Sequence, residues 1–107
     1  MSFLSIHITT SSLAEADKIA RELVNARLAA CVSILPGLRS IYRWEGRVET
    51  AHEHLLIVKT RADLFKDLEQ KVKSLHSYAC PCIIALPVEA GYQPYLDWLA
   101  KETQTPS

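Results

Sequence analysis

Two cysteines and a histidine form the most chemically suggestive group in this chain. Cys80 and Cys82 flank Pro81, and His76 lies shortly before them. Thiolates and imidazoles suit soft or borderline ions such as copper and zinc. On an extended strand, residues i and i+2 share a face but lie about 7 Å apart, so both thiols could bind one ion only if the chain bends at Pro81. The alternative is that these thiols are small buried hydrophobic groups.

A second pair of candidate metal ligands is His52 and His54. Their spacing of two places both imidazoles on one face of a strand, which suits zinc or copper, while Glu53 points to the other face. The alternative is an exposed polar stretch of a hairpin. The sequence gives no reason to expect a required cofactor. If these histidines and cysteines bind an ion, copper or zinc is the expected one.

Several aromatic and charged residues could line a pocket between subunits or anchor a subunit interface. Aromatic walls with a few convergent charges are typical of sites for a small anion or metabolite. Tryptophan, tyrosine and arginine are also the residues that dominate protein interfaces. Both interpretations stay open for the following set: Tyr42, Arg43, Trp44, Glu45, Lys59 and Tyr78.

No pattern in the sequence indicates an enzyme. The three glycines are isolated, so the chain has no glycine-rich loop for a phosphate group. Its serines lack the surroundings of a nucleophile elbow, and no His–acid pair accompanies a cysteine in a recognisable arrangement. We therefore expect a protein without enzymatic activity.

Length and composition indicate one globular domain spanning residues 1–107. Twelve basic residues balance twelve acidic ones, which removes the electrostatic reason to expect nucleic acid or an anionic membrane as partner. Three cysteines form no disulfide framework, and this fits a reducing compartment. We see no signal peptide and no apolar run of the roughly 18 residues that span a bilayer. The expected location is the cytoplasm.

The elements that must position these residues can be read from periodicity. Residues 4–9 alternate apolar and polar side chains, which predicts a strand. Ser12 and Glu15 form a capping-box pattern at the start of a helix that runs to about residue 24. A second strand begins near Ala30.

A long β-hairpin is predicted around Glu45-Gly46. Glycine at the second position of a two-residue connection tolerates the positive φ of a type I′ turn. Pro36-Gly37 interrupts the first strand of the hairpin as a bend or bulge. Pairing outward from the turn places Arg43 opposite Val48 and Tyr42 opposite Glu49. The returning strand ends in residues 55–59.

The remainder of the chain predicts a helix, a strand and a short final helix. Thr60 with Asp63 resembles an N-cap for a helix ending near Leu75. Residues 82–86 form a strand, residues 93–101 a helix, and residues 103–107 are expected to fray. The resulting order is βαββαβ plus a C-terminal helix.

This order predicts an α+β fold with two helices on one face of a four-stranded antiparallel sheet, the ferredoxin-like architecture. Such a sheet leaves its other face uncovered. A small protein of neutral net charge should not leave aromatic and aliphatic side chains in water. We therefore expect oligomerisation through the open face and the hairpin edges.

Five segments resemble the CutA family of divalent-cation tolerance proteins. They are Leu28-Ala-Ala-Cys-Val-Ser-Ile-Leu-Pro-Gly, Ser40-Ile-Tyr-Arg-Trp-Glu-Gly, the strand end at Lys59-Thr60, His76-Ser-Tyr-Ala-Cys-Pro-Cys-Ile-Ile-Ala-Leu-Pro-Val and Tyr95-Leu-Asp-Trp-Leu. The resemblance extends from about Ile6 to Trp98 in the family's order and spacing.

The resemblance implies a homotrimer of ferredoxin-like subunits, similar in assembly to the PII-type signalling proteins, with hairpins that reach across to neighbours. It also implies a role in tolerance to copper and other divalent metals, with weak copper binding as the molecular expectation. The alternative function is a PII-like regulatory or scaffold trimer that binds a small molecule or a partner protein between subunits.

The chain departs from the family at its expected metal ligands. Ala79 and Cys82 occupy two positions that are usually glutamate, and Ile8 occupies the position of a cysteine found in some members. Metal sites proposed for the family therefore cannot be transferred intact, and Cys80-Pro81-Cys82 is the feature that this chain offers instead.

Overall fold

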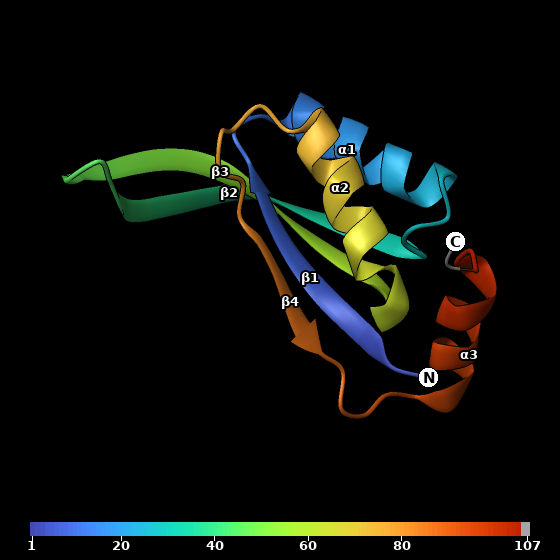
Figure 1. The fold of residues 1–107 in the computed structure, drawn as a ribbon. Helices are drawn as coiled ribbons and strands as arrows, with labels where there is room; N and C mark the ends of the chain where they lie inside the picture. The colour runs from blue at the N-terminus through green and yellow to red at the C-terminus, as the bar shows by residue number, and fades with distance from the viewer. Residues whose placement is uncertain (106–107) are drawn as a thin grey trace.

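Four antiparallel strands and two helices build the two layers of this protein, and a third helix closes one end (Figure 1). The computed structural model describes residues 1–105. The elements are β1 (Phe3–Thr10), α1 (Leu13–Asn25), β2 (Cys31–Trp44), β3 (Arg47–Arg61), a 3-10 turn (Ala62–Leu64), α2 (Phe65–Leu75), β4 (Ile83–Pro87) and α3 (Gln93–Glu102). The predicted α+β, ferredoxin-like order with an extra C-terminal helix is confirmed.

The core lies between one face of the sheet and helices α1 and α2. The strand order is β2-β3-β1-β4, and every neighbouring pair is antiparallel. Ile6 pairs with Val58 and Ile8 with Leu56, and all four side chains are fully buried. Alternation in β1 and β3 sends these residues to the helix side, where they pack with Ile19, Leu23, Leu68 and Val72.

The β2–β3 hairpin extends beyond the other strands, as Figure 1 shows. β1 pairs with β3 only as far as His54, so the rest of β3 is paired with β2 alone. At the turn, Glu45 has φ 49° and Gly46 has φ 80°, the two positive values of a type I′ turn. The predicted register, with Arg43 opposite Val48, is confirmed.

The predicted irregularity at Pro36-Gly37 is a bulge. The register shifts between Leu35 and Leu38, and Gly37 has φ 82°, a conformation that costs glycine little. Leu38 then lies opposite Glu53. The bulge therefore resets which β2 residues share a face with which β3 residues along the projecting part of the hairpin.

The capping box at α1 forms only in part. The Ser12 hydroxyl accepts a hydrogen bond from the Glu15 amide at 3.1 Å, as predicted. The Glu15 carboxylate does not return to Ser12. It accepts bonds from the amide and hydroxyl of Ser77, at 2.8 and 3.1 Å, and so ties α1 to the loop after α2.

The predicted N-cap at Thr60 is wrong. Thr60 lies inside β3, and its fully buried hydroxyl donates to the Leu28 carbonyl at 2.6 Å. The chain enters the 3-10 turn from Arg61, whose guanidinium donates to Asp63 at 2.7 Å. A tertiary hydrogen bond thus takes the hydroxyl that local spacing assigned to the helix.

The expected fraying after α3 is wrong for Thr103 and Gln104. Thr103 is buried, and Gln104 donates its amide to the Arg27 carbonyl at 2.8 Å and its side chain to the Ala26 carbonyl at 2.9 Å. Arg27 in turn donates to the Lys101 carbonyl at 2.8 Å. These bonds hold the end of α3 against the turn between α1 and β2. Residues 106–107 lie outside the described part of the chain.

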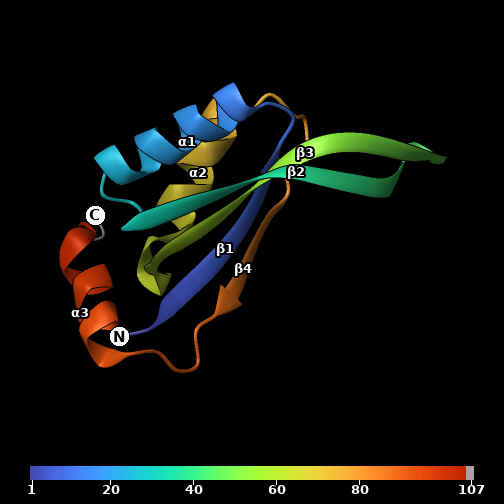
Figure 2. The same ribbon diagram turned by 180° about the vertical axis from the view of Figure 1, so that it is seen from behind.

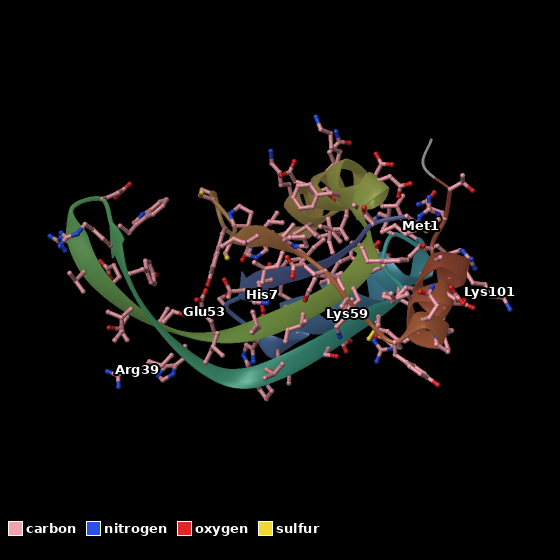
Figure 3. All side chains as sticks on the ribbon, turned by 90° about the horizontal axis from the view of Figure 1, so that it is seen from below. Met1, His7, Arg39, Glu53, Lys59 and Lys101 are labelled. Carbon is pink, nitrogen blue, oxygen red and sulfur yellow. The ribbon has the colours of Figure 1, made fainter. Side chains whose placement is uncertain are left out.

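The sheet face opposite the helices is uncovered (Figures 2 and 3). His7 and Lys59, labelled in Figure 3, lie on it together with apolar side chains. Ile84 is 54% exposed, and other exposed apolar residues on this face and the hairpin are Leu35, Ile41, Tyr42, Trp44, Val48 and Leu86. No helix within residues 1–105 is long and apolar enough to cross a membrane.

Replacing Thr60 by Val tests the buried bond to Leu28. The variant keeps the shape of the side chain but leaves the Leu28 carbonyl without this donor, so the free energy of unfolding should fall by about 1–3 kcal/mol. Chemical denaturation at equal protein concentration measures the loss. Thr50→Val on the exposed hairpin is the matched control and should change stability by less than about 0.5 kcal/mol. Equal stability of both variants would contradict the assignment.

Candidate functional site

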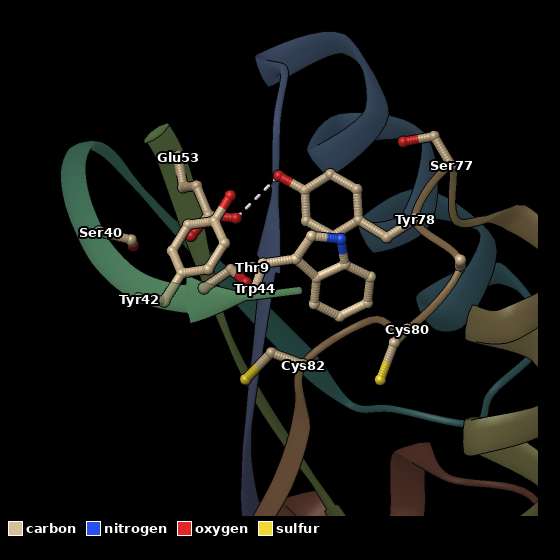
Figure 4. Close-up of a pocket in the computed structure, with 10 residues that line it drawn as sticks. Thr9, Ser40, Tyr42, Trp44, Glu53, Ser77, Tyr78, Cys80 and Cys82 are labelled. Carbon is tan, nitrogen blue, oxygen red and sulfur yellow. Dashed lines mark hydrogen bonds between the residues drawn. The ribbon is translucent and has the colours of Figure 1, made fainter. Parts of the chain in front are cut away.

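A cavity of about 600 Å³ opens where the hairpin leaves the sheet (Figure 4). Its walls come from the end of β1, the projecting part of the hairpin and the loop between α2 and β4. The lining residues are Thr9, Ser40, Tyr42, Trp44, Glu53, Ser77, Tyr78, Ala79, Cys80 and Cys82. A volume of this size is that of a small-molecule site.

Strand alternation places the hairpin residues in the cavity. Ser40, Tyr42 and Trp44 follow one another at a spacing of two on β2, so they share a face. The register from the turn is unbroken as far as Leu38, which lies opposite Glu53, so this is also the face of Glu53 on β3. Arg43 lies on the opposite face for the same reason.

Glu53 and Tyr78 form the polar centre of the cavity. The Tyr78 hydroxyl donates to Glu53 Oε2 at 2.8 Å, and Glu53 is only 7% exposed. Among the described residues, no lysine, arginine or histidine lies within ion-pairing distance of this carboxylate. Burial first, and then the hydrogen bond and charge of Glu53, raise the pKa of Tyr78 to about 12.

His76 holds the loop that carries Tyr78. Its Nε2 lies 2.7 Å from the Thr9 carbonyl, and its Nδ1 accepts from the Tyr78 amide at 3.1 Å. This pair of contacts assigns the proton to Nε2, which donates to Thr9. Both ring nitrogens are thus engaged, and a metal ion could bind His76 only by displacing one of these partners.

The two thiols differ in their surroundings. Cys80 is exposed, whereas Cys82 is half-buried. Burial, followed by the nearby charge of Glu53, raises the pKa of the Cys82 thiol and so disfavours the thiolate that binds metal. Within residues 1–105, no three His, Cys, Asp or Glu side chains are grouped so that they could hold a metal ion. Metal binding by Cys80 and Cys82 stays a prediction.

His52 and His54 lie away from the cavity. They alternate with Glu53 along β3 and therefore occupy the other face of the hairpin, as the sequence predicts. His52 is exposed and opposite Arg39, while His54 is half-buried and its Nδ1 has no hydrogen-bond partner. The structure does not bring this pair together with the cysteines.

Three of the six residues predicted for a pocket line it, namely Tyr42, Trp44 and Tyr78. Arg43 is on the opposite face of the hairpin, and Glu45 is in the turn. Lys59 pairs with Ser5 and Cys31 near the far end of the sheet. These three residues lie outside this cavity because register, rather than proximity in sequence, decides which side chains meet. A pocket between subunits, or an interface anchored by the whole set, stays a prediction.

Sequence reasoning missed Glu53 as the polar centre, together with Thr9, Ser40 and Ser77. Counting the register outward from the turn as far as Leu38, before the bulge is reached, could have placed Glu53 on the face of Tyr42. Nothing comparable points to Thr9 or Ser77, because tertiary packing brings their segments to the cavity.

The family profile described as CutA1 divalent ion tolerance protein matches residues 4–102. The chain is 52% identical over 96 residues to the divalent-cation tolerance protein CutA of Thermus thermophilus, covering 90% of this chain and 93% of that protein. It is 48% identical over 94 residues to CutA of Archaeoglobus fulgidus, covering 88% and 91%. The chain belongs to the CutA1 family.

Solved CutA structures agree with this assignment. The Thermus thermophilus protein superimposes with a TM-score of 0.94 at 49% identity, covering 95% of this chain and 99% of that chain. CutA1 from Oryza sativa gives a TM-score of 0.95 at 39% identity, covering 97% and 95%. CutA relatives are named with different compartments, since that of Arabidopsis thaliana is called chloroplastic and the Archaeoglobus fulgidus structure is titled periplasmic.

Replacing Glu53 by Gln tests the polar centre of the cavity. Removing the carboxylate charge should lower the pKa of Tyr78 from about 12, but not fully to about 10, because burial remains. The absorbance of tyrosinate as a function of pH measures the shift, and Tyr78→Phe identifies the contribution of this residue. An unchanged Tyr78 pKa in the Gln variant would refute the contact.

The same shift has a consequence for stability. Because the pKa of Tyr78 is raised in the folded state, the unfolded chain loses this proton first as the pH rises. The contribution of Tyr78 is therefore complete below pH ~10 and is lost between pH ~10 and ~12. Glu53→Gln should narrow the pH range over which this contribution to stability is lost, because it lowers the pKa of Tyr78 in the folded state.

Proposed function

We propose that this CutA1-family protein acts as a homotrimer in the cellular response to divalent cations, copper above all. The observation that carries the proposal is the uncovered apolar sheet face in a chain that matches the family along nearly its whole length. Exposed apolar area of this kind is stabilised by association. The role in metal response is supported by the names of the relatives, which are divalent-cation tolerance proteins.

The proposed trimer uses the open face and the hairpin. β4 is a short edge strand that carries Ile84 and Leu86 towards the uncovered side, and the hairpin carries Ile41 and Val48. Unpaired strand edges and apolar arms are the features through which sheets join. A second subunit laid on the open face would remove Ile84 and Leu86 from water. Ile41 and Val48 share the other face of the hairpin with Arg43, so they would be covered by a neighbour that contacts that face.

Direct metal binding in this proposal is weak and falls to Cys80 and Cys82. Both thiols lie on the cavity wall. Because two thiols are too few ligands for a copper or zinc ion, and the described residues group no third donor with them, the ion would have to recruit a further ligand. The contacts of His76 argue against the ring as that ligand. No enzymatic activity, nucleic acid or membrane is part of the proposal, and the proposed location is the cytoplasm.

A second candidate is a PII-like regulatory trimer that binds a small molecule. The observation in its favour is the cavity of about 600 Å³ with aromatic walls and a buried carboxylate.

Trimer formation is tested with Ile84→Asp. Sedimentation equilibrium of the unmodified protein should give three times the chain mass of 12.0 kDa. A carboxylate on the open face would be buried without a partner, so the variant should dissociate. Gln70→Asp on the exposed side of α2 is the control and should remain a trimer. A stable monomer of the unmodified protein would refute the assembly.

Metal binding is tested by isothermal titration of the reduced protein with Cu(I), Cu(II) and Zn(II). If the thiols are ligands, the Cys80→Ser/Cys82→Ser variant should bind copper at least about tenfold more weakly, because hydroxyls are poor ligands for soft ions. Cys31→Ser, remote from the cavity, should bind as the unmodified protein does. Identical binding by the two-cysteine variant would refute this site.

The cellular role requires a separate measurement. Copper sensitivity of a bacterial host that lacks its own CutA should be relieved by the unmodified protein. Relief by the Cys80→Ser/Cys82→Ser variant as well would assign tolerance to something other than thiol ligation.

A further inference from the structure

The cavity at the base of the hairpin contains one charged side chain, Glu53. Glu53 is 7% exposed, and its carboxylate accepts a hydrogen bond from the Tyr78 hydroxyl. No basic residue in the described chain forms an ion pair with it. A buried carboxylate is costly unless an opposite charge or several donors compensate it. The negative charge of Glu53 is therefore uncompensated, and the cavity should favour a ligand that carries a positive charge.

The walls around this carboxylate are aromatic. Tyr42 and Trp44 come from β2, and Tyr78 comes from the loop before β4, so two distant segments supply the rings (Figure 4). The negative face of an aromatic ring attracts cations, and tryptophan does so best. Several rings around one carboxylate are the arrangement with which proteins recognise quaternary ammonium and methylated amine groups.

We propose that this cavity binds a small organic cation, a quaternary ammonium or protonated amine, between the rings of Tyr42, Trp44 and Tyr78 and the carboxylate of Glu53. The proposal rests on the second candidate function and names its ligand class. A volume of about 600 Å³ accommodates a molecule larger than choline, so the cationic group would occupy only the part next to Glu53.

The lining residues disfavour the other ligand classes. An anion, as expected from the sequence, would have relied on Arg43 and Lys59, which lie outside the cavity. A zinc or copper ion requires three or more protein donors in a compact group, which the described residues do not form. A neutral apolar molecule would leave the charge of Glu53 uncompensated.

Binding is measured on the full-length assembled protein by tryptophan fluorescence and isothermal titration. The chain has two tryptophans, so a Trp98→Phe background assigns the fluorescence signal to Trp44. The probes are choline, tetramethylammonium, and the neutral isostere of choline in which a tert-butyl group replaces trimethylammonium. The cations should change Trp44 emission saturably, and the neutral isostere should bind at least about tenfold more weakly.

Variants separate charge from shape. Glu53→Gln keeps the size of the side chain and its ability to accept from Tyr78, yet removes the charge, and should weaken choline binding by about tenfold or more. Trp44→Leu should do the same by removing a ring. Glu69→Gln on α2, outside the cavity, is the matched control and should bind choline like the unmodified protein. Sedimentation of each variant checks that the assembly is intact.

The outcomes are distinct. Equal binding of choline and its neutral isostere, or unchanged choline binding by Glu53→Gln, would overturn the cation proposal while leaving a ligand-binding trimer in place. Absence of any binding by either cation, in a protein that sediments as an intact trimer, would also overturn it. Glu53-dependent binding of Zn(II) that excludes choline would assign the carboxylate to a metal.

Discussion

The register of β2 against β3 is the constraint on which the remainder of the structure depends. β3 is one uninterrupted strand of 15 residues, yet its first part belongs to a projecting arm and its last part to the core. Because side chains alternate along the strand, fixing the face of one residue fixes the face of every other residue in β3. A slip by one residue would turn Leu56 and Val58 out of the core and would exchange Glu53 for His54 in the cavity. Core and site are therefore specified together.

Within that frame, Glu53 gives the cavity its character. Glutamate is rarely almost fully buried unless it is paired, and Glu53 is buried although it lies outside the hydrophobic core. The loop opposite it is held by groups from β1 and α1, through the contacts of His76 with Thr9 and of Ser77 with Glu15. Tyr78 reaches the carboxylate because this loop is fixed on both sides. The cavity wall that carries Tyr78 is thus fixed to β1 and α1.

Periodicity and turn chemistry were sufficient to predict the strands, the helices and the hairpin register. They rest on local rules, and the type I′ turn at Glu45-Gly46 obeys them. Thr60 was misread because a buried bond to Leu28 outweighs its local capping pattern. Gln104 was misread because its partners at Ala26 and Arg27 are remote in sequence. In each case a tertiary contact decided the outcome, and no spacing pattern records such contacts.

The candidate site was predictable to the same extent. The aromatic residues were recognisable by type, and alternation sorted Tyr42 and Trp44 from Arg43. The role of His76 was not predictable, because a histidine near two cysteines resembles a metal ligand in sequence and only the packed loop shows both its nitrogens in use. Family-level likeness added the fold but not the site, since Ala79 and Cys82 replace the expected acidic residues.

The hairpin turn also bears on the order in which the chain folds. β2 and β3 are joined by two residues, whereas β1 and β4 are separated by most of the chain. Closing the short connection costs less conformational entropy, so the hairpin can form before β1 pairs with β4. The arm that carries Ile41 and Val48 is then complete before the core is closed. We expect that chains in which the hairpin has formed first expose these apolar side chains before the core is stable. Folding then competes with premature self-association at high protein concentration.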